Sequence, residues 1–264
     1  RYIQPLDQSF FPGKIGIDVG CGFGRHVYNA AAFGAAMVGV DLSSAIDAAW
    51  RNTRHLPNVH LVQANLYRLP FRRGGFDFAY SLGVLHHLPD PERGFSCLLT
   101  LVRPGGTVLV WVYSKSRRLT NLLLETVRKA TTRFSRRTQT VITYGCAAID
   151  WSCFIVPYRL GSKVPWCGRI LNRMAFPRLK GYSAYPFQVI WADWFDRLTA
   201  PIRFYYDGQD VEGWFRRAGL SRIQIAATGL FGWTACGQRP VEASSPDQES
   251  VAVAPDESRS PISP

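Results

Sequence analysis

The 264-residue sequence has no uninterrupted run of about 18 apolar residues, although 47% of its residues are hydrophobic. This absence predicts that no helix of the chain spans a membrane. The opening residues also lack a cationic segment followed by an apolar stretch, so we expect no signal peptide. A chain of this length can nevertheless bury one large core, or a core and a subdomain.

Cysteine is also scarce. The six cysteines form no C-x-x-C pair and no spacing typical of a zinc finger, so we expect no metal site from them. Buried or unpaired thiols in a reducing compartment are the favoured interpretation, which predicts a cytoplasmic protein.

Acidic residues are few, with 19 Asp and Glu against 31 Lys and Arg, for a formal net charge of +12. The excess lies in one segment: residues 114–206 hold 16 basic and four acidic groups, whereas the rest of the chain holds 15 of each. Basic groups are densest between Lys115 and Arg137, where Glu125 is the only acid. Such a segment suits an anionic substrate, an anionic lipid surface or nucleic acid, and equally an ordinary solvated surface.

The most informative segment that is present is residues 15–24, a short apolar strand followed by glycine at every second position. A helical stretch and a second apolar strand follow, and Asp41 ends that strand. A bare turn lets a ligand approach the main chain, and an acid at the end of the second strand can accept both hydroxyls of a ribose. This pattern predicts a nucleoside-binding βαβ unit. The glycines are spaced G-x-G-x-G rather than G-x-G-x-x-G, which disfavours an NAD-dependent dehydrogenase.

Further strands are expected at residues 59–63, 76–80 and 107–113, and a Pro-Gly-Gly turn precedes the last of them. Together with D-x-G-x-G-x-G from Asp18 to Gly24, this order resembles the class I S-adenosylmethionine-dependent methyltransferases, in the branch called methyltransferase type 11, over residues 14–113. The resemblance implies an α/β fold with a Rossmann-like, seven-stranded class I methyltransferase sheet.

The family topology is interrupted after the fifth strand. The expected last helix (residues 209–218) and two last strands (222–227 and 231–236) come late, so we expect a core of residues 1–113 and 207–237. The intervening residues 114–206 are too long for a plain loop and predict a helical, basic insertion that forms a lid or substrate subdomain. Its first helix is expected at residues 119–134. Residues 238–264 are rich in Ser, Pro, Glu and Asp, which predicts a disordered tail.

The resemblance also implies which residues bind S-adenosylmethionine. They are Asp18, Gly20, Cys21, Gly22 and Gly24 in the turn, Asp41 and Leu42 after the second strand, Ala64, Asn65 and Leu66 after the third, and Ser81 and Leu82 after the fourth. Asp18 is expected near the methionine amino group and Asp41 at the ribose, with Gly20 and Gly22 giving access to the backbone. Asn65 stands where the family usually has Asp, and its amide oxygen can still accept from the adenine amino group.

His86 and His87 lie about one turn beyond Ser81, near the expected methyl position. A histidine has a suitable pKa for a catalytic base, although such a pair also suits helix capping or packing. Related quinone O-methyltransferases carry two glutamates and a histidine here, thought to bind a divalent cation. Gly83, His86 and His87 occupy those places, so no metal site is expected.

The most economical hypothesis is O-, C- or N-methylation of a small-molecule or lipid-like acceptor. No Asn/Asp-Pro-Pro-Tyr/Phe motif and no Pro-Cys follow the fourth strand, which disfavours amino-directed DNA, protein glutamine and pyrimidine C5 methylation. Two alternatives remain: an RNA-modifying methyltransferase that uses the basic insertion, and a non-catalytic S-adenosylmethionine-binding scaffold protein.

Overall fold

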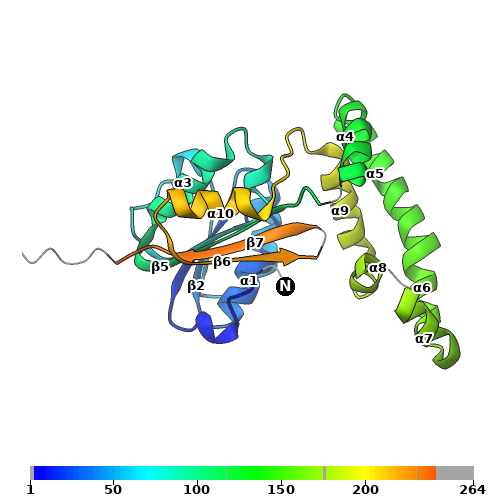
Figure 1. Ribbon diagram of the computed structural model, residues 1–264, viewed down its shortest axis with the longest axis horizontal. Helices are drawn as coiled ribbons and strands as arrows, with labels where there is room; N and C mark the ends of the chain where they lie inside the picture. Colours follow the sequence, from blue (N-terminus) through cyan, green and yellow to red (C-terminus); the bar gives the residue numbers. More distant parts are fainter. Residues whose placement is uncertain (1–2, 117, 175–176, 230, 242–264) are drawn as a thin grey trace, which may run out of the picture.

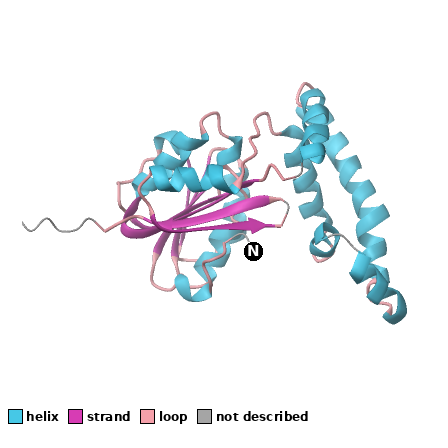
Figure 2. Ribbon diagram, viewed as in Figure 1, coloured by secondary structure: helices cyan, strands magenta, loops and turns pink. Residues whose placement is uncertain are grey.

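The computed structural model describes residues 3–116, 118–174, 177–229 and 231–241, and its centre is a seven-stranded sheet (Figure 1; Figure 2). The strand order is β3-β2-β1-β4-β5-β7-β6. The strands are β1 (Ile15–Val19), β2 (Ala36–Asp41), β3 (Val59–Gln63), β4 (Phe76–Leu82), β5 (Val102–Tyr113), β6 (Ser221–Thr228) and β7 (Gly232–Gln238). β7 is antiparallel to both of its neighbours, and the other pairs are parallel. The predicted class I methyltransferase fold is therefore confirmed.

Helices cover both faces of the sheet. α1 (Arg25–Ala32) and α2 (Ala45–Thr53) pack on one face, whereas α3 (Pro91–Leu101) and α10 (Gly208–Arg217) pack on the other (Figure 1). Each face has its own buried apolar cluster. The chain leaves β1 toward β2 and later returns to the opposite side of β1 as β4, so the strand order reverses between β1 and β4. Ligands of open α/β sheets bind at the carboxyl ends of the strands beside such a reversal.

Helices fill the segment between β5 and α10 and form an arm beside the sheet (Figure 1). They are α4 (Arg118–Thr131), α5 (Arg136–Asp150), a π-helical stretch (Trp151–Ile155), α6 (Val156–Gly161), α7 (Pro165–Met174), α8 (Pro177–Tyr182) and α9 (Phe187–Thr199). α5 and α9 pack together around a small core of Ala147, Ile155 and Ile190, ringed by aromatic side chains. The arm is therefore a folded unit with its own core rather than a loop.

One helix of the arm bears on a sequence expectation. α5, the π-helical stretch and α6 run without a break over the 26 residues Arg136–Gly161, which are long and apolar enough by length and composition to cross a membrane. Core helices of soluble proteins also meet this criterion, so the expectation that no helix spans a membrane stays a prediction. It rested on uninterrupted apolar runs, and Asp150 and Arg159 interrupt this one.

The end of the chain is described only as far as residue 241. β7 ends at Gln238, and the N–H of Arg239 donates to the carbonyl of Gly106, which fixes the chain beside β5. The tail predicted over residues 238–264 lies mostly outside the described residues.

Candidate functional site

The glycine turn after β1 adopts a left-handed backbone at all three glycines, with φ of 86° at Gly20, 52° at Gly22 and 78° at Gly24. A Cβ at Gly20 would lie 2.1 Å from Val84 Cγ2, and the Gly20 N–H already donates to the carbonyl of Val40 at 2.7 Å. A Cβ at Gly22 would meet nothing within 4 Å. Gly20 is thus required for packing, and Gly22 is the glycine that leaves open space for a ligand.

Asp41 lies at the end of β2 and holds this turn. Its Oδ2 accepts from the Gly22 N–H at 2.9 Å, and its Oδ1 accepts from the N–H and the hydroxyl of Ser43 at 2.9 and 2.7 Å. A carboxylate has about four acceptor positions, so one position on Oδ2 remains for a ligand hydroxyl. The same side chain therefore orders the turn and faces the open space at Gly22.

Asp18 is a buried acid in the middle of the site. Its residue is 1% exposed, and neither carboxylate oxygen has a hydrogen-bond partner among the described residues. Burial first, and then the nearby charge of Asp41, raises the pKa of Asp18 well above its ordinary value. Tyr80, the register partner of Asp18 on β4, also buries an unpaired hydroxyl. A buried carboxyl group with no partner is costly, and a cationic group brought next to it would relieve that cost.

The other residues predicted near the turn and after β3 differ in how far they face the site. Cys21 is buried, and burial raises the pKa of its thiol. Leu42 follows Asp41 and is 67% exposed, so its side chain is free to pack against an adenine ring. The N–H of Ala64 donates to the carbonyl of Asp41 at 3.0 Å, which joins the ends of β2 and β3. These contacts place the ends of the strands next to one another.

Asn65 is exposed, and its side-chain oxygen accepts from the Tyr67 N–H at 2.9 Å, which caps a 3₁₀ helix (Leu66–Arg68). The capping role occupies one of the two acceptor positions of the amide oxygen. Leu66 is buried in the core against α3.

At the end of β4, Ser81 is buried, and its hydroxyl donates to the carbonyl of Val19 at 2.8 Å. Ser81 therefore ties β4 to β1, and Leu82, which is half-buried, is the residue of the predicted pair that stays accessible.

The two histidines have different surroundings. His86 is fully buried between the rings of His87 and Tyr113, and neither of its ring nitrogens has a hydrogen-bond partner among the described residues. Burial, and then His87 and Arg203, lowers the pKa of His86 well below its ordinary value. His86 thus acts as a neutral packing residue in this structure.

His87 is better connected and partly accessible. Its Nδ1 lies 2.8 Å from the carbonyl of Ile202, and its Nε2 lies 3.4 Å from Oδ1 of Asp196. Burial lowers the pKa of His87, while Asp196 and the Ile202 carbonyl oppose that shift. The neutral ring, with Nδ1–H donating to Ile202, leaves Nε2 as an acceptor next to a carboxylate.

Asp196 joins the arm to the core. It accepts from the hydroxyl of Tyr113 at 2.8 Å and pairs with Arg203 at 2.8 Å. Tyr205 extends the network, since its hydroxyl donates to Glu125 at 3.1 Å. Tyr113 is the last residue of β5, so the arm is anchored at the carboxyl edge of the sheet.

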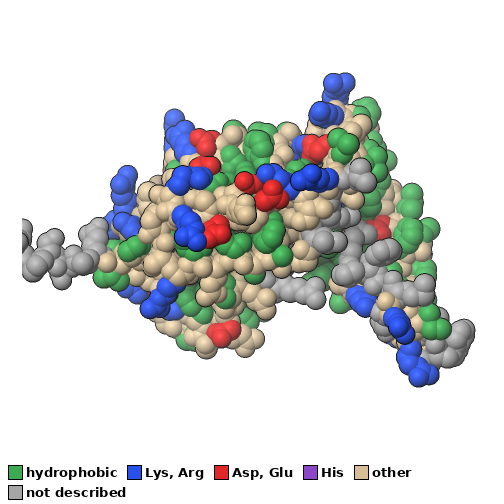
Figure 3. Space-filling view, viewed as in Figure 1, with side chains coloured by type: hydrophobic (Ala, Val, Ile, Leu, Met, Phe, Trp, Pro, Cys, Tyr) green, Lys and Arg blue, Asp and Glu red, His purple; other side chains and the backbone are tan. Residues whose placement is uncertain are grey.

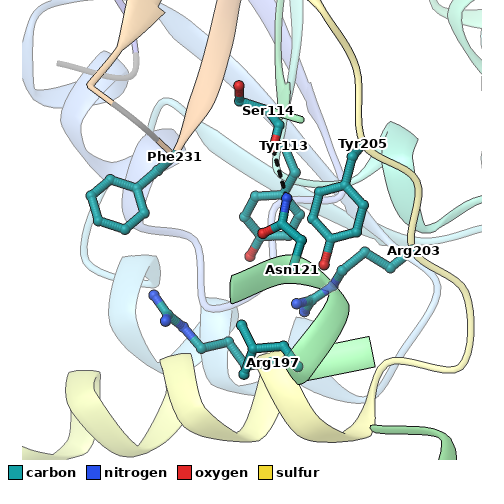
Figure 4. A pocket seen from close by; sticks show the side chains of 8 residues that line it. Tyr113, Ser114, Asn121, Arg197, Arg203, Tyr205 and Phe231 are labelled. Carbon is teal, nitrogen blue, oxygen red and sulfur yellow. Dashed lines mark hydrogen bonds between the residues drawn. The ribbon is translucent and has the colours of Figure 1, made fainter. Parts of the chain in front are cut away.

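A pocket opens at this junction (Figure 4). The residues that line it are Tyr113, Ser114, Asn121, Leu124, Arg197, Arg203, Tyr205 and Phe231. They come from the end of β5, from α4 and α9, and from the segments that precede α10 and β7. Asn121 is fixed by donating to the Ser114 carbonyl at 3.1 Å. The two guanidinium groups are paired, Arg197 with Asp193 at 2.8 Å and Arg203 with Asp196.

Tyr113 ends the strand that the sequence predicts at residues 107–113, whereas the sequence did not point to Ser43, Asp196, Arg203 or Tyr205. Ser43 follows the second strand by two residues and could have been found from that spacing. Asp196 and Arg203 had no local signal, because only the tertiary packing of the arm brings them to Tyr113.

The residues present fit S-adenosylmethionine. Asp18 offers an unpaired buried carboxyl group for an ammonium, Gly22 leaves open backbone, and Asp41 keeps an acceptor position for a hydroxyl. The described residues contain no group of three or more His, Cys, Asp or Glu that could hold a metal ion.

Comparisons with known proteins agree with this arrangement. Residues 17–110 match a family model described as a methyltransferase domain. The chain is 33% identical over 112 residues to the tRNA U34 carboxymethyltransferase of Pseudoalteromonas atlantica, which covers 41% of this chain and 34% of that protein. It is 31% identical over 113 residues to phosphoethanolamine N-methyltransferase 2 of Caenorhabditis elegans, covering 40% of this chain and 25% of that one. The chain thus spans about a third of the length of the first relative and a quarter of the second.

Among solved structures, an O-methyltransferase family protein from Burkholderia thailandensis superposes with a TM-score of 0.52 at 15% identity, over 90% of this chain and 54% of that one. This likeness supports the fold. The family match ends at residue 110, before the pocket and the arm begin.

Proposed function

We propose that the chain, whose residues 17–110 match the methyltransferase domain, transfers a methyl group from S-adenosylmethionine to a small-molecule or lipid-like acceptor held between the sheet and the arm. The observation that carries this proposal is the junction at Tyr113, where Asp196 and Arg203 of the arm meet the carboxyl end of β5 beside a small cavity. β1, β4 and β5 are parallel neighbours, so Tyr113 and the turn after Val19 lie at the same edge of the sheet. An acceptor in the pocket would therefore lie at the edge of the sheet that carries Asp18, Gly22 and Asp41.

S-adenosylmethionine, when bound, supplies a methyl group on a sulfonium, whose departure leaves a neutral sulfur. The work left to the protein is to align the acceptor and to keep water out. Asp18 and Asp41 would hold the amino group and a ribose hydroxyl, and Gly22 would let the ligand reach the backbone. The arm would cover the acceptor, because α4 and α9 supply the far wall of the pocket (Figure 4).

His87 is the residue that we assign as base where the acceptor must lose a proton. Burial lowers its pKa, so the ring is neutral at neutral pH and can accept a proton at Nε2. The Asp196 carboxylate, 3.4 Å from Nε2, would stabilise the imidazolium that forms. His86, buried on all sides, would position His87 by packing against its ring, with the ring centroids 4.2 Å apart.

The lining favours a neutral or singly charged acceptor with an aromatic or apolar body. Arg197 and Arg203 are neutralised by Asp193 and Asp196, so they do not present unpaired positive charge to a ligand. The remaining walls offer hydroxyl and amide groups, together with the rings of Tyr205 and Phe231. Such walls match a hydroxyl- or amine-bearing compound.

The test has two stages. Calorimetric titration with S-adenosylmethionine, S-adenosylhomocysteine and NAD is expected to show binding of the first two only. Transfer of labelled methyl groups to a panel of phenols, amines and lipid extracts is then measured by mass spectrometry, with His87→Gln as the variant. Cofactor binding without transfer to any acceptor class would favour a non-catalytic binding protein instead.

RNA modification is the second candidate, because a relative of that class matches and the arm carries exposed basic residues. Arg128 lies in the basic stretch between Lys115 and Arg137, but it is buried and pairs with Glu125, so its loss would damage folding. Neutralising the exposed Lys129, Arg133 and Arg137 is the better test. Salt-dependent RNA binding that this triple variant abolishes would support the RNA candidate.

A further inference from the structure

The continuous helix Arg136–Gly161 lies along the outer edge of the arm (Figure 1), and several of its large apolar side chains are exposed. We use the name outer face for the exposed side chains of Val141, Ile149, Phe154 and Leu160. Ile149, Phe154 and Leu160 are 62%, 59% and 61% exposed. Large apolar side chains that remain exposed along a whole helix mark an interaction surface rather than ordinary solvent contact.

Two charged residues, Asp150 and Arg159, follow the first turn of this helix, and both turn inward. Asp150 is buried and accepts from Trp194 Nε1 at 2.9 Å. Arg159 donates to the carbonyls of Ser183 and Tyr185 and stacks over the ring of Trp151 at 4.8 Å. The outer face is therefore uncharged from residue 138 to residue 162, a length of about 37 Å at 1.5 Å per residue.

The opposite side of the same helix is covered by protein. Ala147 and Ile155 pack with Ile190 of α9 and its aromatic neighbours, and Thr143 accepts from Trp191 Nε1 at 3.2 Å. A helix with one apolar side outward and one side packed on polar and aromatic groups suits a position in the plane of a membrane surface rather than across it.

Exposed basic residues stand beyond both ends of the outer face. They are Lys129, Arg133, Arg136 and Arg137 at one end, and Lys163, Arg169 and Arg173 at the other. Figure 3 shows the same distribution, with hydrophobic side chains along the outer edge of the arm and Lys and Arg at its two ends. All four acids of residues 114–206 are already engaged within the fold, Glu125 with Arg128, Asp150 with Trp194, Asp193 with Arg197 and Asp196 with Arg203.

We propose that the outer face docks on the surface of an anionic lipid membrane. Its apolar side chains would enter the boundary between headgroups and acyl chains, and the basic ends would contact anionic headgroups. A second copy of the chain fits less well, because an antiparallel pair of outer faces would set basic ends against basic ends. The inference is independent of methyl transfer, since it uses no residue of the pocket or of the glycine turn.

The experiment is flotation of the full chain with vesicles of two compositions: phosphatidylcholine alone, and equal parts of phosphatidylcholine and phosphatidylglycerol. We expect binding to the anionic vesicles only. The variant Ile149→Gln/Phe154→Gln/Leu160→Gln should bind at least about tenfold more weakly, because three apolar side chains lose their burial in lipid. Lys163→Gln should weaken binding about fivefold, as expected for one basic residue near an anionic surface, and high salt should do the same.

The matched control is Trp50→Gln on α2, a side chain 55% exposed on the sheet-bearing core rather than on the arm. It should bind vesicles like the unaltered protein, and circular dichroism should show all variants folded. Equal binding by the triple variant, or equal binding to both vesicle types, would overturn the proposal. A dimer in light scattering that the triple variant dissociates, without vesicle binding, would assign the face to self-association. Resistance to extraction by alkaline carbonate would mean that the helix crosses the membrane.

Discussion

Asp41→Ala tests the cofactor site most directly, because Asp41 has a structural role and an expected ligand role that can be separated. The substitution removes three hydrogen bonds, from the Gly22 N–H and from the N–H and hydroxyl of Ser43. At about 0.5–1.5 kcal/mol for each bond in a half-exposed setting, the free energy of unfolding should fall by about 2–3 kcal/mol. Loss of a charge-assisted bond to the ribose should also lower the affinity for S-adenosylmethionine at least about tenfold, which corresponds to about 1.4 kcal/mol.

The two effects are measured separately, the first by urea unfolding without ligand and the second by calorimetric titration below the unfolding transition. Ser43→Ala is the matched control. It removes the bond from the Ser43 hydroxyl to Asp41 at 2.7 Å and the bond from the Ala45 N–H to that hydroxyl at 3.2 Å, but it leaves the carboxylate in place. It should therefore cost about 1–2 kcal/mol in stability and leave the affinity unchanged. An Asp41→Ala protein that is less stable but binds with unchanged affinity would refute the ribose assignment and leave Asp41 with the turn alone.

Three further outcomes are expected. Because burial raises the pKa of Asp18, the contribution of Asp18 to stability is present at low pH and is lost as the pH rises through the folded-state pKa. The variant Asp18→Asn should therefore have a higher melting temperature at neutral pH without ligand, and that temperature should depend less on pH. The variant should also bind the cofactor more weakly in calorimetry. Gly20→Ala should destabilise the fold by about 2–4 kcal/mol in urea unfolding, from left-handed strain and overlap with Val84, whereas Gly22→Ala should cost about 1–2 kcal/mol from strain alone. His87→Gln should lower kcat by about 10²- to 10⁴-fold for an acceptor that must lose a proton, with the acid limb below the ordinary histidine pKa gone from the pH–rate profile; an unchanged profile would exclude His87 as the base.

The core of the fold could be predicted because its signals are local and periodic. The strand at residues 59–63 and the helix at 209–218 reproduce β3 and α10 within a residue or two, and the glycine turn lies where the D-x-G-x-G-x-G pattern places it. The roles of individual glycines could not be predicted, because they depend on Val84, which lies 64 residues after Gly20. The cytoplasmic location stays a prediction.

The acceptor side was beyond sequence reasoning for a different reason. Asp196 and Arg203 contact Tyr113 because α9 packs against α5 and α4. The spacing of these residues in the sequence does not indicate that contact. The helix Arg136–Gly161 was missed as a continuous apolar element because Asp150 and Arg159 interrupt its sequence. Only the structure shows that the Asp150 and Arg159 side chains point to the inner side of the arm, where they bind Trp194 and the Ser183 carbonyl. The outer face therefore carries no charge.

The inner and outer sides of the arm therefore have different roles. Its inner side supplies Asp196 and Arg203 to the pocket at Tyr113, and its outer side supplies Ile149 and Phe154 to the surface that we assign to lipid. α9 connects the two, since it carries Asp196 toward the core and packs Ile190 against the helix behind the outer face. The same packed helix therefore lies between the residues at Tyr113 and the surface that we assign to lipid.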